Sequence, residues 1–181
     1  DAGAPHFVVT RPSDSGPASL RDALEKAAAE TALGAEHVVI TFSPRLRGRT
    51  ILLRSGALEA TNDSGAIHVV AAAKAPEGNS LTAQIDGIVL NANYQSRILE
   101  TTAGGEVWFA GLTLTKGEAQ QGGGVWNEGD LTLEDCVISD NRVSPNRTPH
   151  GGGIYNDGGT LTLIGSRVSG NLAGAPQGED G

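Results

Sequence analysis

The stretch Gly122–Asn141, GGGVWNEGDLTLEDCVISDN, is followed by a second copy, GGGIYNDGGTLTLIGSRVSGN, at Gly151–Asn171. Val125–Asn127 aligns with Ile154–Asn156, and after one inserted residue Leu131–Leu133 aligns with Leu161–Leu163. A fainter copy at Val107–Gly117 aligns with Leu131–Asn141. Self-similarity at a period of roughly 20–50 residues is typical of folds in which each repeat stacks on the previous one.

The repeats contain short strands. In L-T-L the leucines share one face and the threonine takes the other, because successive side chains of a strand point to opposite sides. Three such strands in each turn of a coil would bury the leucines inside, and each strand would pair in parallel with its counterpart one coil away. Similar runs occur earlier, at His37–Phe42, Thr50–Leu53, Ile67–Ala72 and Leu81–Asp86.

Asparagines recur at the bends between these strands. Asn127 aligns with Asn156 at one bend, and Asn141 aligns with Asn171 at another. An amide side chain both donates and accepts hydrogen bonds, so stacked copies can bond to each other or to the backbone of the bend. We therefore expect two structural asparagine ladders, with the glycine runs at corners that leave no room for a Cβ atom.

The segment 1–34 differs from the rest of the chain. Ser19 followed by Asp22 is a capping-box pattern, the apolar residues that follow have helical spacing, and Gly34 suits a C-terminal cap. These signals predict one amphipathic helix over about 20–32. Since a stack of parallel strands exposes unpaired edges at its ends, we expect residues 1–34 to cap the coils formed by residues 35–181.

The opening run FVVT…DSGPASLRDAL…HVVITFSPRLRGRTILL, the IDG at Ile85–Gly87 and the GGG-V/I-W/Y-N coils resemble bacterial right-handed parallel β-helix proteins of the pectate-lyase-like superfamily. The resemblance implies an all-β right-handed solenoid with an N-terminal capping helix, forming one domain over residues 1–181. It also implies a secreted or cell-surface location. One branch of these proteins carries a cysteine where this chain has Ala18–Ser19, so that cysteine's pairing does not apply here.

Composition limits the partners that the chain is expected to have. Glycine is frequent (26 residues) and aromatic residues are rare (4%), which favours short strands and tight turns over helices. The net charge of −8 repels phosphate groups, and no run of about 18 apolar residues occurs. We therefore expect neither nucleic-acid binding nor membrane insertion. The single cysteine, Cys136, excludes an internal disulfide bond and is interpreted as a small core residue.

Three aromatic side chains are predicted to point away from the core. If Val125 and Ile154 point inward, Trp126 and Tyr155 point outward, one above the other, and Trp108 lies outward by the same alternation. Exposed aromatic rings can bind the apolar faces of sugar rings. These three residues are therefore candidates for binding polysaccharide.

Arg142 and Arg167 complete the candidate glycan-binding set. The alternative for the aromatic rings is packing under a neighbouring loop at 143–150. Outward threonines also suggest an array of the ice-binding type, but it is incomplete: Thr113, Thr115, Thr132 and Thr162.

Carboxylates are frequent around the same repeats. Paired carboxylates can hydrolyse glycosides or hold Ca²⁺ together with carbonyl oxygens, and polysaccharide lyases of this fold combine such ligands with a basic residue. The basic candidates are Arg142, Arg147 and Arg167. No pair has a recognisable catalytic spacing, so solvated turn charges are the simpler interpretation, and no catalytic residue is assigned. The acidic residues concerned are Glu128, Asp130, Glu134, Asp135, Asp140 and Asp157.

His37 and His68 open two similar strands and would lie near each other on adjacent coils. Two histidines without a third ligand do not define a metal site, so no metal or other cofactor is assigned, although Ca²⁺ stays open. The last residue, Gly181, stands where the next glycine run would begin. We therefore expect the stack to be truncated there, leaving an end open to another coil, a second copy or a partner chain.

The first functional hypothesis is a bacterial extracellular or cell-surface module with a structural or adhesive role, acting through glycans and without catalysis. A polysaccharide lyase or glycoside hydrolase acting on an acidic polysaccharide is the second. Self-assembly of solenoid fragments end to end is the third.

Overall fold

A computed structural model describes residues 3–71, 87–144 and 150–174 of the chain. The predicted strand at 81–86 and the candidate Arg147 lie outside the described residues. Within them the chain is mostly β, and every strand pair runs parallel. The prediction of a mainly β chain built from parallel strands is therefore confirmed.

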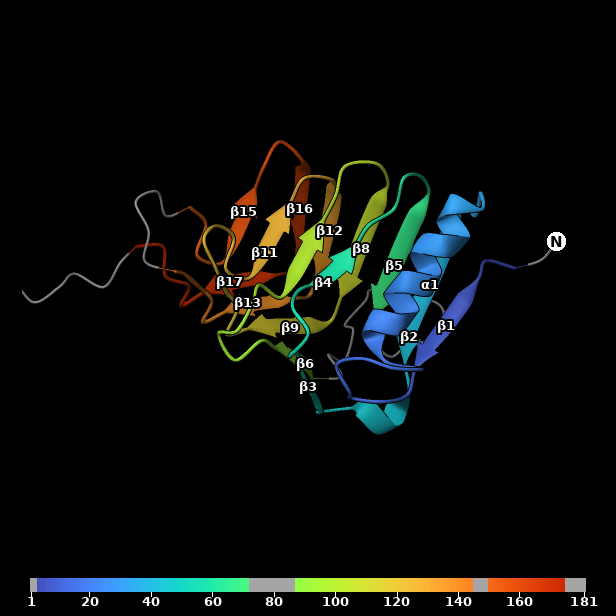
Figure 1. Cartoon of the computed structure of the whole chain (residues 1–181), viewed down its shortest axis with the longest axis horizontal. Coiled ribbons are helices and arrows are strands. Elements are labelled where there is room, and N and C mark those ends of the chain that lie inside the picture. Colours follow the sequence, from blue (N-terminus) through green and yellow to red (C-terminus); the bar gives the residue numbers. More distant parts are fainter. Residues whose placement is uncertain (1–2, 72–86, 145–149, 175–181) are drawn as a thin grey trace, which may run out of the picture.

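Three parallel sheets make up the body of the molecule (Figure 1). Sheet A contains, in spatial order, β1 (His6–Val9), β2 (His37–Phe42), β5 (Ala66–Val70), β8 (Glu106–Ala110), β12 (Asp130–Glu134) and β16 (Thr160–Ile164). Sheet B contains β3 (Thr50–Leu52), β6 (Ile88–Asn91), β9 (Leu112–Thr115), β13 (Val137–Ser139) and β17 (Arg167–Ser169). Sheet C contains β4 (Leu58–Ala60), β7 (Leu99–Thr101), β11 (Val125–Asn127) and β15 (Ile154–Asn156). A short pair, β10 (Glu118–Ala119) and β14 (Arg142–Val143), lies between sheets B and C along the chain.

From β2 onward the chain visits sheets A, B and C in rotation, and each strand pairs with its counterpart one circuit later. Leu131 pairs with Val107 on one side and with Leu161 on the other. Val125 pairs in the same way with Ile154. These pairings have the register of the aligned sequence copies, so the repeat in the sequence is a repeat in space.

From β8 onward, the circuits differ in length mainly between sheets B and C. Nine residues separate the end of β9 from the start of β11, and fourteen separate β13 from β15. The passage from sheet A to sheet B takes only one or two residues in the same circuits. It turns at a residue with positive φ: Gly111 (72°), Asp135 (48°) and Gly165 (57°). A single left-handed residue turns the chain from sheet A to sheet B here, a conformation that glycine adopts easily and aspartate tolerates.

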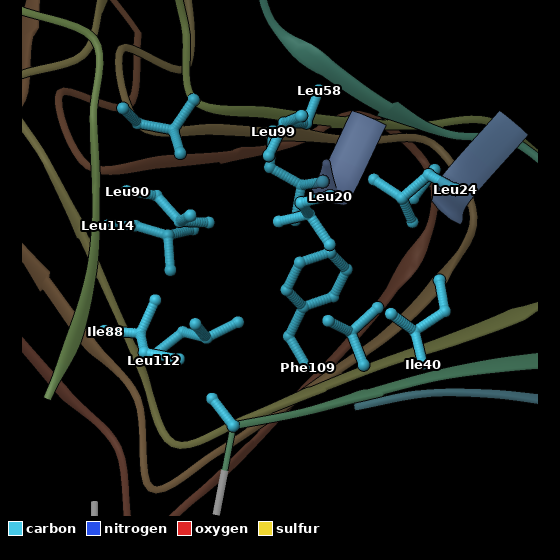
Figure 2. Close-up of a cluster of buried hydrophobic side chains, with 14 of the residues drawn as sticks. Leu20, Leu24, Ile40, Leu58, Ile88, Leu90, Leu99, Phe109, Leu112 and Leu114 are labelled. Carbon is cyan, nitrogen blue, oxygen red and sulfur yellow. The ribbon is translucent and has the colours of Figure 1, made fainter. Parts of the chain in front are cut away.

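The core lies inside the three sheets. Inward residues such as Phe109 and Leu133 are fully buried, whereas the equivalent Leu163 in the last described circuit is 44% exposed. Figure 2 shows Leu20 and Leu24 of the helix entering the same cluster as Phe109. The core is therefore continuous from the helix through the stacked circuits.

The helix α1 spans Leu20–Ala32. The Ser19 hydroxyl accepts a hydrogen bond from the Asp22 backbone N–H, which satisfies one of the unpaired donors of the first turn. The Asp22 carboxylate accepts from the backbone N–H of Ala18 and from Lys26. Its pKa is lowered by these partners, Lys26 first. The apolar side of α1 packs against β1, β2 and β4, at the end of the stack nearest the N-terminus (Figure 1).

The glycine run at 122–124 stands where neighbouring backbones come close. A Cβ on Gly123 would lie 2.1 Å from the Arg142 carbonyl oxygen, and one on Gly124 would lie 2.5 Å from that of Gly153. Such distances are far inside van der Waals contact, so these positions require glycine because the next circuit passes directly against them.

Candidate functional site on the outer face of sheet C

Trp126 and Tyr155 lie side by side on the outer face of sheet C. They are register partners on β11 and β15, with ring centroids 6.2 Å apart and ring planes at 69°. Val125 is fully buried, so the alternation of the strand directs Trp126 outward. Glu100 and Glu59 continue the line across β7 and β4. We call these four residues, Glu59, Glu100, Trp126 and Tyr155, the outer column.

Arg97 supports the centre of the outer column. Its guanidinium carbon lies 4.5 Å from the centre of the Trp126 ring, within cation–π distance. It donates hydrogen bonds to the carbonyl oxygens of Gly122 (2.9 Å) and Gln121 (2.8 Å) and to Glu100 Oε2 (2.7 Å). Burial lowers the pKa of Arg97, and the Glu100 charge opposes this shift. Arg97 thus fixes both the indole ring and the neighbouring carboxylate.

Trp126 presents an apolar surface to solvent. Its side chain is half-buried, and its indole nitrogen is fully buried, with no hydrogen-bond partner among the described residues. Since the one polar atom of the side chain is buried, the exposed part of the ring is carbon. An apolar ring face held on a strand is the type of surface on which a pyranose ring stacks.

His150 adds a further ring beside Tyr155. The two rings are stacked, with centroids 5.8 Å apart and planes at 22°. His150 also forms an isolated parallel bridge with Gln121, the residue whose carbonyl accepts from Arg97. Tyr155 therefore has two aromatic neighbours, Trp126 and His150.

Two carboxylates stand at the other end of the outer column. Glu59 is exposed, and the side chain of Glu100 is 37% exposed. Arg97 donates a hydrogen bond to one carboxylate oxygen of Glu100, and the other oxygen of Glu100 has no hydrogen-bond partner in the described part of the chain. Ionised carboxylates only accept hydrogen bonds, so these groups can receive hydroxyl donors from a ligand.

No known family was found for this chain. No protein-family model matches it, and no curated protein or solved structure does so either. In addition, no helix in the described ranges is long and apolar enough to cross a membrane.

The Asn127 ladder lies directly behind the aromatic pair. Asn127 is fully buried, accepts a hydrogen bond from the Thr101 hydroxyl and donates to Asn156 Oδ1 and to the Thr160 carbonyl. Asn156 in turn donates to the Gly159 carbonyl. Since Asn127 follows Trp126 on β11, these bonds hold the backbone that carries the indole ring.

The second ladder joins Asn141 and Asn171. Asn141 donates to Asn171 Oδ1 (3.0 Å) and to the Leu114 carbonyl (3.1 Å), and it accepts from the backbone N–H of Gly117 (2.7 Å). Asn171 donates to the Ile138 carbonyl (2.8 Å). Each side chain thus ties its own circuit to a neighbouring one at the bend after sheet B.

The third aromatic candidate, Trp108, lies elsewhere. It belongs to β8 of sheet A, where it pairs in register with His68 and Thr132. Its ring lies 5.0 Å from that of His68, whose ring lies 4.2 Å from that of His37. Trp108 therefore belongs to a separate aromatic group on sheet A and not to the outer column.

The two histidines of that group do not complete a metal site. Burial, followed by the charge of His37, lowers the pKa of His68, and Glu106 acts in the opposite direction. In the part of the chain that the structure describes, no three His, Cys, Asp or Glu side chains are close enough to hold a metal ion.

The two candidate arginines occupy other places again. The Arg142 guanidinium lies 4.1 Å from the centre of the Tyr94 ring and pairs with Glu118 at 2.7 Å, at the corner formed by β10 and β14. Arg167 is exposed on sheet B, where it donates to the Ser169 hydroxyl (3.2 Å). The five candidate glycan-binding residues therefore do not form one site. Trp126 and Tyr155 contact each other on sheet C, whereas Trp108, Arg142 and Arg167 lie on other parts of the molecule.

The candidate carboxylates are also distributed. Asp130 and Glu134 alternate outward on β12 of sheet A, and Asp135 and Asp140 occupy bends with positive φ. Glu128 lies near Arg97, whose pKa it influences. The sixth, Asp157, lies just beyond β15 in an exposed turn.

Sequence reasoning missed Arg97, Glu100, Glu59 and His150. A signal for Glu100 exists: Leu99, Glu100 and Thr101 are an earlier copy of Val125–Asn127, one circuit before it. This copy is hard to recognise because threonine replaces the ladder asparagine and no glycine triplet precedes it.

Proposed function

We propose that the chain is a right-handed parallel β-helix module of the bacterial cell surface or extracellular space that binds glycans without catalysis. The rotation of the chain through three parallel sheets supports the solenoid, and the packing of α1 against the first strands supports its role as a cap. The cell-surface location rests on the resemblance of the capping and corner motifs described above.

The pairing of Trp126 with Tyr155 is the observation that carries the glycan-binding proposal. Two aromatic side chains from adjacent circuits are held side by side on paired strands, so a sugar chain can contact both rings at fixed relative positions. Arg97 fixes one ring, and the Asn127 ladder holds the strand beneath it. A preorganised surface of this kind loses little conformational entropy when a ligand binds.

An enzymatic role has weaker support. Lyase chemistry needs a basic group free to remove a proton, close to acidic groups that bind substrate or Ca²⁺. Arg97 and Arg142 are each paired with a carboxylate, at 2.7 Å in both cases. The described residues thus offer a binding surface more readily than a set of convergent catalytic groups.

Affinity electrophoresis against a panel of neutral and acidic polysaccharides tests the proposal. We expect retardation of the wild-type chain by at least one polysaccharide and its loss in Tyr155→Ala. Trp108→Ala is the matched control, because it removes an aromatic residue from sheet A only. Equal retardation of all three proteins would refute a role for sheet C. Release of unsaturated, ultraviolet-absorbing products would replace the binding proposal by the lyase alternative.

A further inference from the structure

We infer that the outer column selects uncharged, hydroxyl-rich sugar chains over polyuronates. This inference rests on the proposed glycan-binding function and adds the chemical class of the ligand. It follows from which polar groups on this face are free and which are already used.

Among the described residues, carboxylates outnumber guanidinium groups beside the aromatic pair, so the net charge there is negative. Glu100 is the register partner of Trp126, and Glu59 is the register partner of Glu100. Neighbouring strands are about 4.8 Å apart, so a sugar stacked on Trp126 has the Glu100 carboxylate within reach. Glu128 adds a further negative charge near Arg97.

The positive charge at this site is already engaged. Arg97 directs three of its N–H groups to Gly122, Gln121 and Glu100, and only 11% of its side chain is exposed. Its remaining charge is largely compensated by the ion pair with Glu100. A carboxylate on the ligand would therefore meet the negative charge of Glu59 and Glu100, and the described residues beside the aromatic pair supply no free guanidinium to offset the repulsion.

A neutral sugar fits the same groups. The apolar face of its ring can stack on the carbon surface of Trp126, while its hydroxyl groups donate to the carboxylates at the edge of the platform. Hydrogen bonds to a charged acceptor are the stronger ones, so Glu100 both favours a hydroxyl donor and disfavours an anion. The net charge of −8 on the whole chain acts in the same direction.

Isothermal titration at pH 8 and low salt compares the two ligand classes. The probes are neutral β-linked oligosaccharides of glucose, mannose and xylose, and oligogalacturonate and oligomannuronate of the same length. We expect the best neutral ligand to bind at least about tenfold more tightly than either uronate, with the difference shrinking as salt screens the repulsion.

Isosteric variants test the carboxylates themselves. Glu100→Gln keeps an acceptor for Arg97 and removes the charge, and the double variant Glu59→Gln/Glu100→Gln removes both charges. We expect about a fivefold loss of neutral-ligand affinity in Glu100→Gln and a narrower neutral-to-uronate ratio in the double variant. Glu134→Gln on sheet A is the matched control and should change neither quantity. Circular dichroism establishes that each variant is folded.

The possible outcomes distinguish a failure of the inferred sugar preference from a failure of the proposed glycan-binding function. If uronates bind as tightly as neutral chains or more tightly, and Tyr155→Ala abolishes that binding, the inference is wrong and the binding function stands. The inference is also wrong if the ratio of neutral-ligand affinity to uronate affinity is the same in the double variant as in the wild type. If no glycan binds, or Tyr155→Ala binds like the wild type, the proposed function fails as well.

Discussion

Replacing Asn127, the buried residue of the asparagine ladder behind Trp126, should destabilise the fold more than replacing its exposed neighbour Asn156. In Asn127→Ala the Thr101 hydroxyl, which is fully buried, loses its acceptor, at a cost of about 1–3 kcal/mol. The bond to the Thr160 carbonyl, on the exposed last strand of sheet A, is worth about 1 kcal/mol. The loss of unfolding free energy is therefore about 2–4 kcal/mol. Asn156→Ala should cost about 0.5–1 kcal/mol, because Asn156 is solvent-exposed.

Asn127→Asp adds a pH-dependent test of the same geometry. The new carboxyl would face the Thr160 carbonyl in a buried position, so its folded pKa should be raised above the unfolded value. The variant should then be least stable at neutral pH and should recover stability, relative to the wild type, as the pH falls from the raised folded pKa towards about 4, with the recovery complete once the unfolded carboxyl is also protonated.

Guanidinium chloride unfolding, followed by circular dichroism and Trp fluorescence between pH 4 and pH 8, measures these differences. The reasoning is refuted if Asn127→Ala and Asn156→Ala have the same effect. It is equally refuted if the stability of Asn127→Asp follows the wild-type pH profile.

Three further perturbations have defined outcomes. Gly123→Ala should cost about 3 kcal/mol of stability or prevent folding, because its Cβ would lie 2.1 Å from the Arg142 carbonyl oxygen. Gly158→Ala should cost about 1 kcal/mol, because φ is +79° there but the space around the Cβ is open. Thermal melting of the two variants compares these effects. Burial raises the pKa of the Cys136 thiol to about 11, so Ellman's reagent should react only after unfolding, and fast reaction of the native chain would contradict the structure. Burial raises the pKa of Asp14, but hydrogen bonds from Arg21, Ser55 and Arg54 outweigh it and lower the pKa to about 2. The wild type should therefore lose this stabilisation as the pH falls from 4 to 2, and Asp14→Asn should show a shallower acid transition in that range.

The repeat made much of the fold predictable. Residues 107–171 reveal their register because glycines, inward leucines and ladder asparagines recur together, and each of these residue types answers a specific packing or hydrogen-bonding need. The helix could be predicted for a local reason, since Ser19 and Asp22 mark its start within a few residues.

The candidate site was harder to predict from the sequence, because residues that point outward share no packing constraint. Alternation correctly directs Trp126 outward and assigns Trp108 the same direction, but it does not say which sheet each one faces from. The support of Trp126 by Arg97 depends on a bend that brings residues 97 and 122 together. To predict that contact, one must know the register of an earlier circuit, in which Thr101 replaces the expected asparagine.

The unequal passages between sheets B and C indicate where this architecture accepts new sequence. Five additional residues separate β13 from β15, compared with β9 and β11, yet the strands on either side keep their pairing. A peptide epitope or affinity tag grafted at this corner should be displayed without shifting the rungs, whereas the same graft at the one- or two-residue turns from sheet A to sheet B would interrupt the fold. Diversification of such a scaffold, natural or engineered, is therefore expected at the corner between sheets B and C in the circuits from β8 onward.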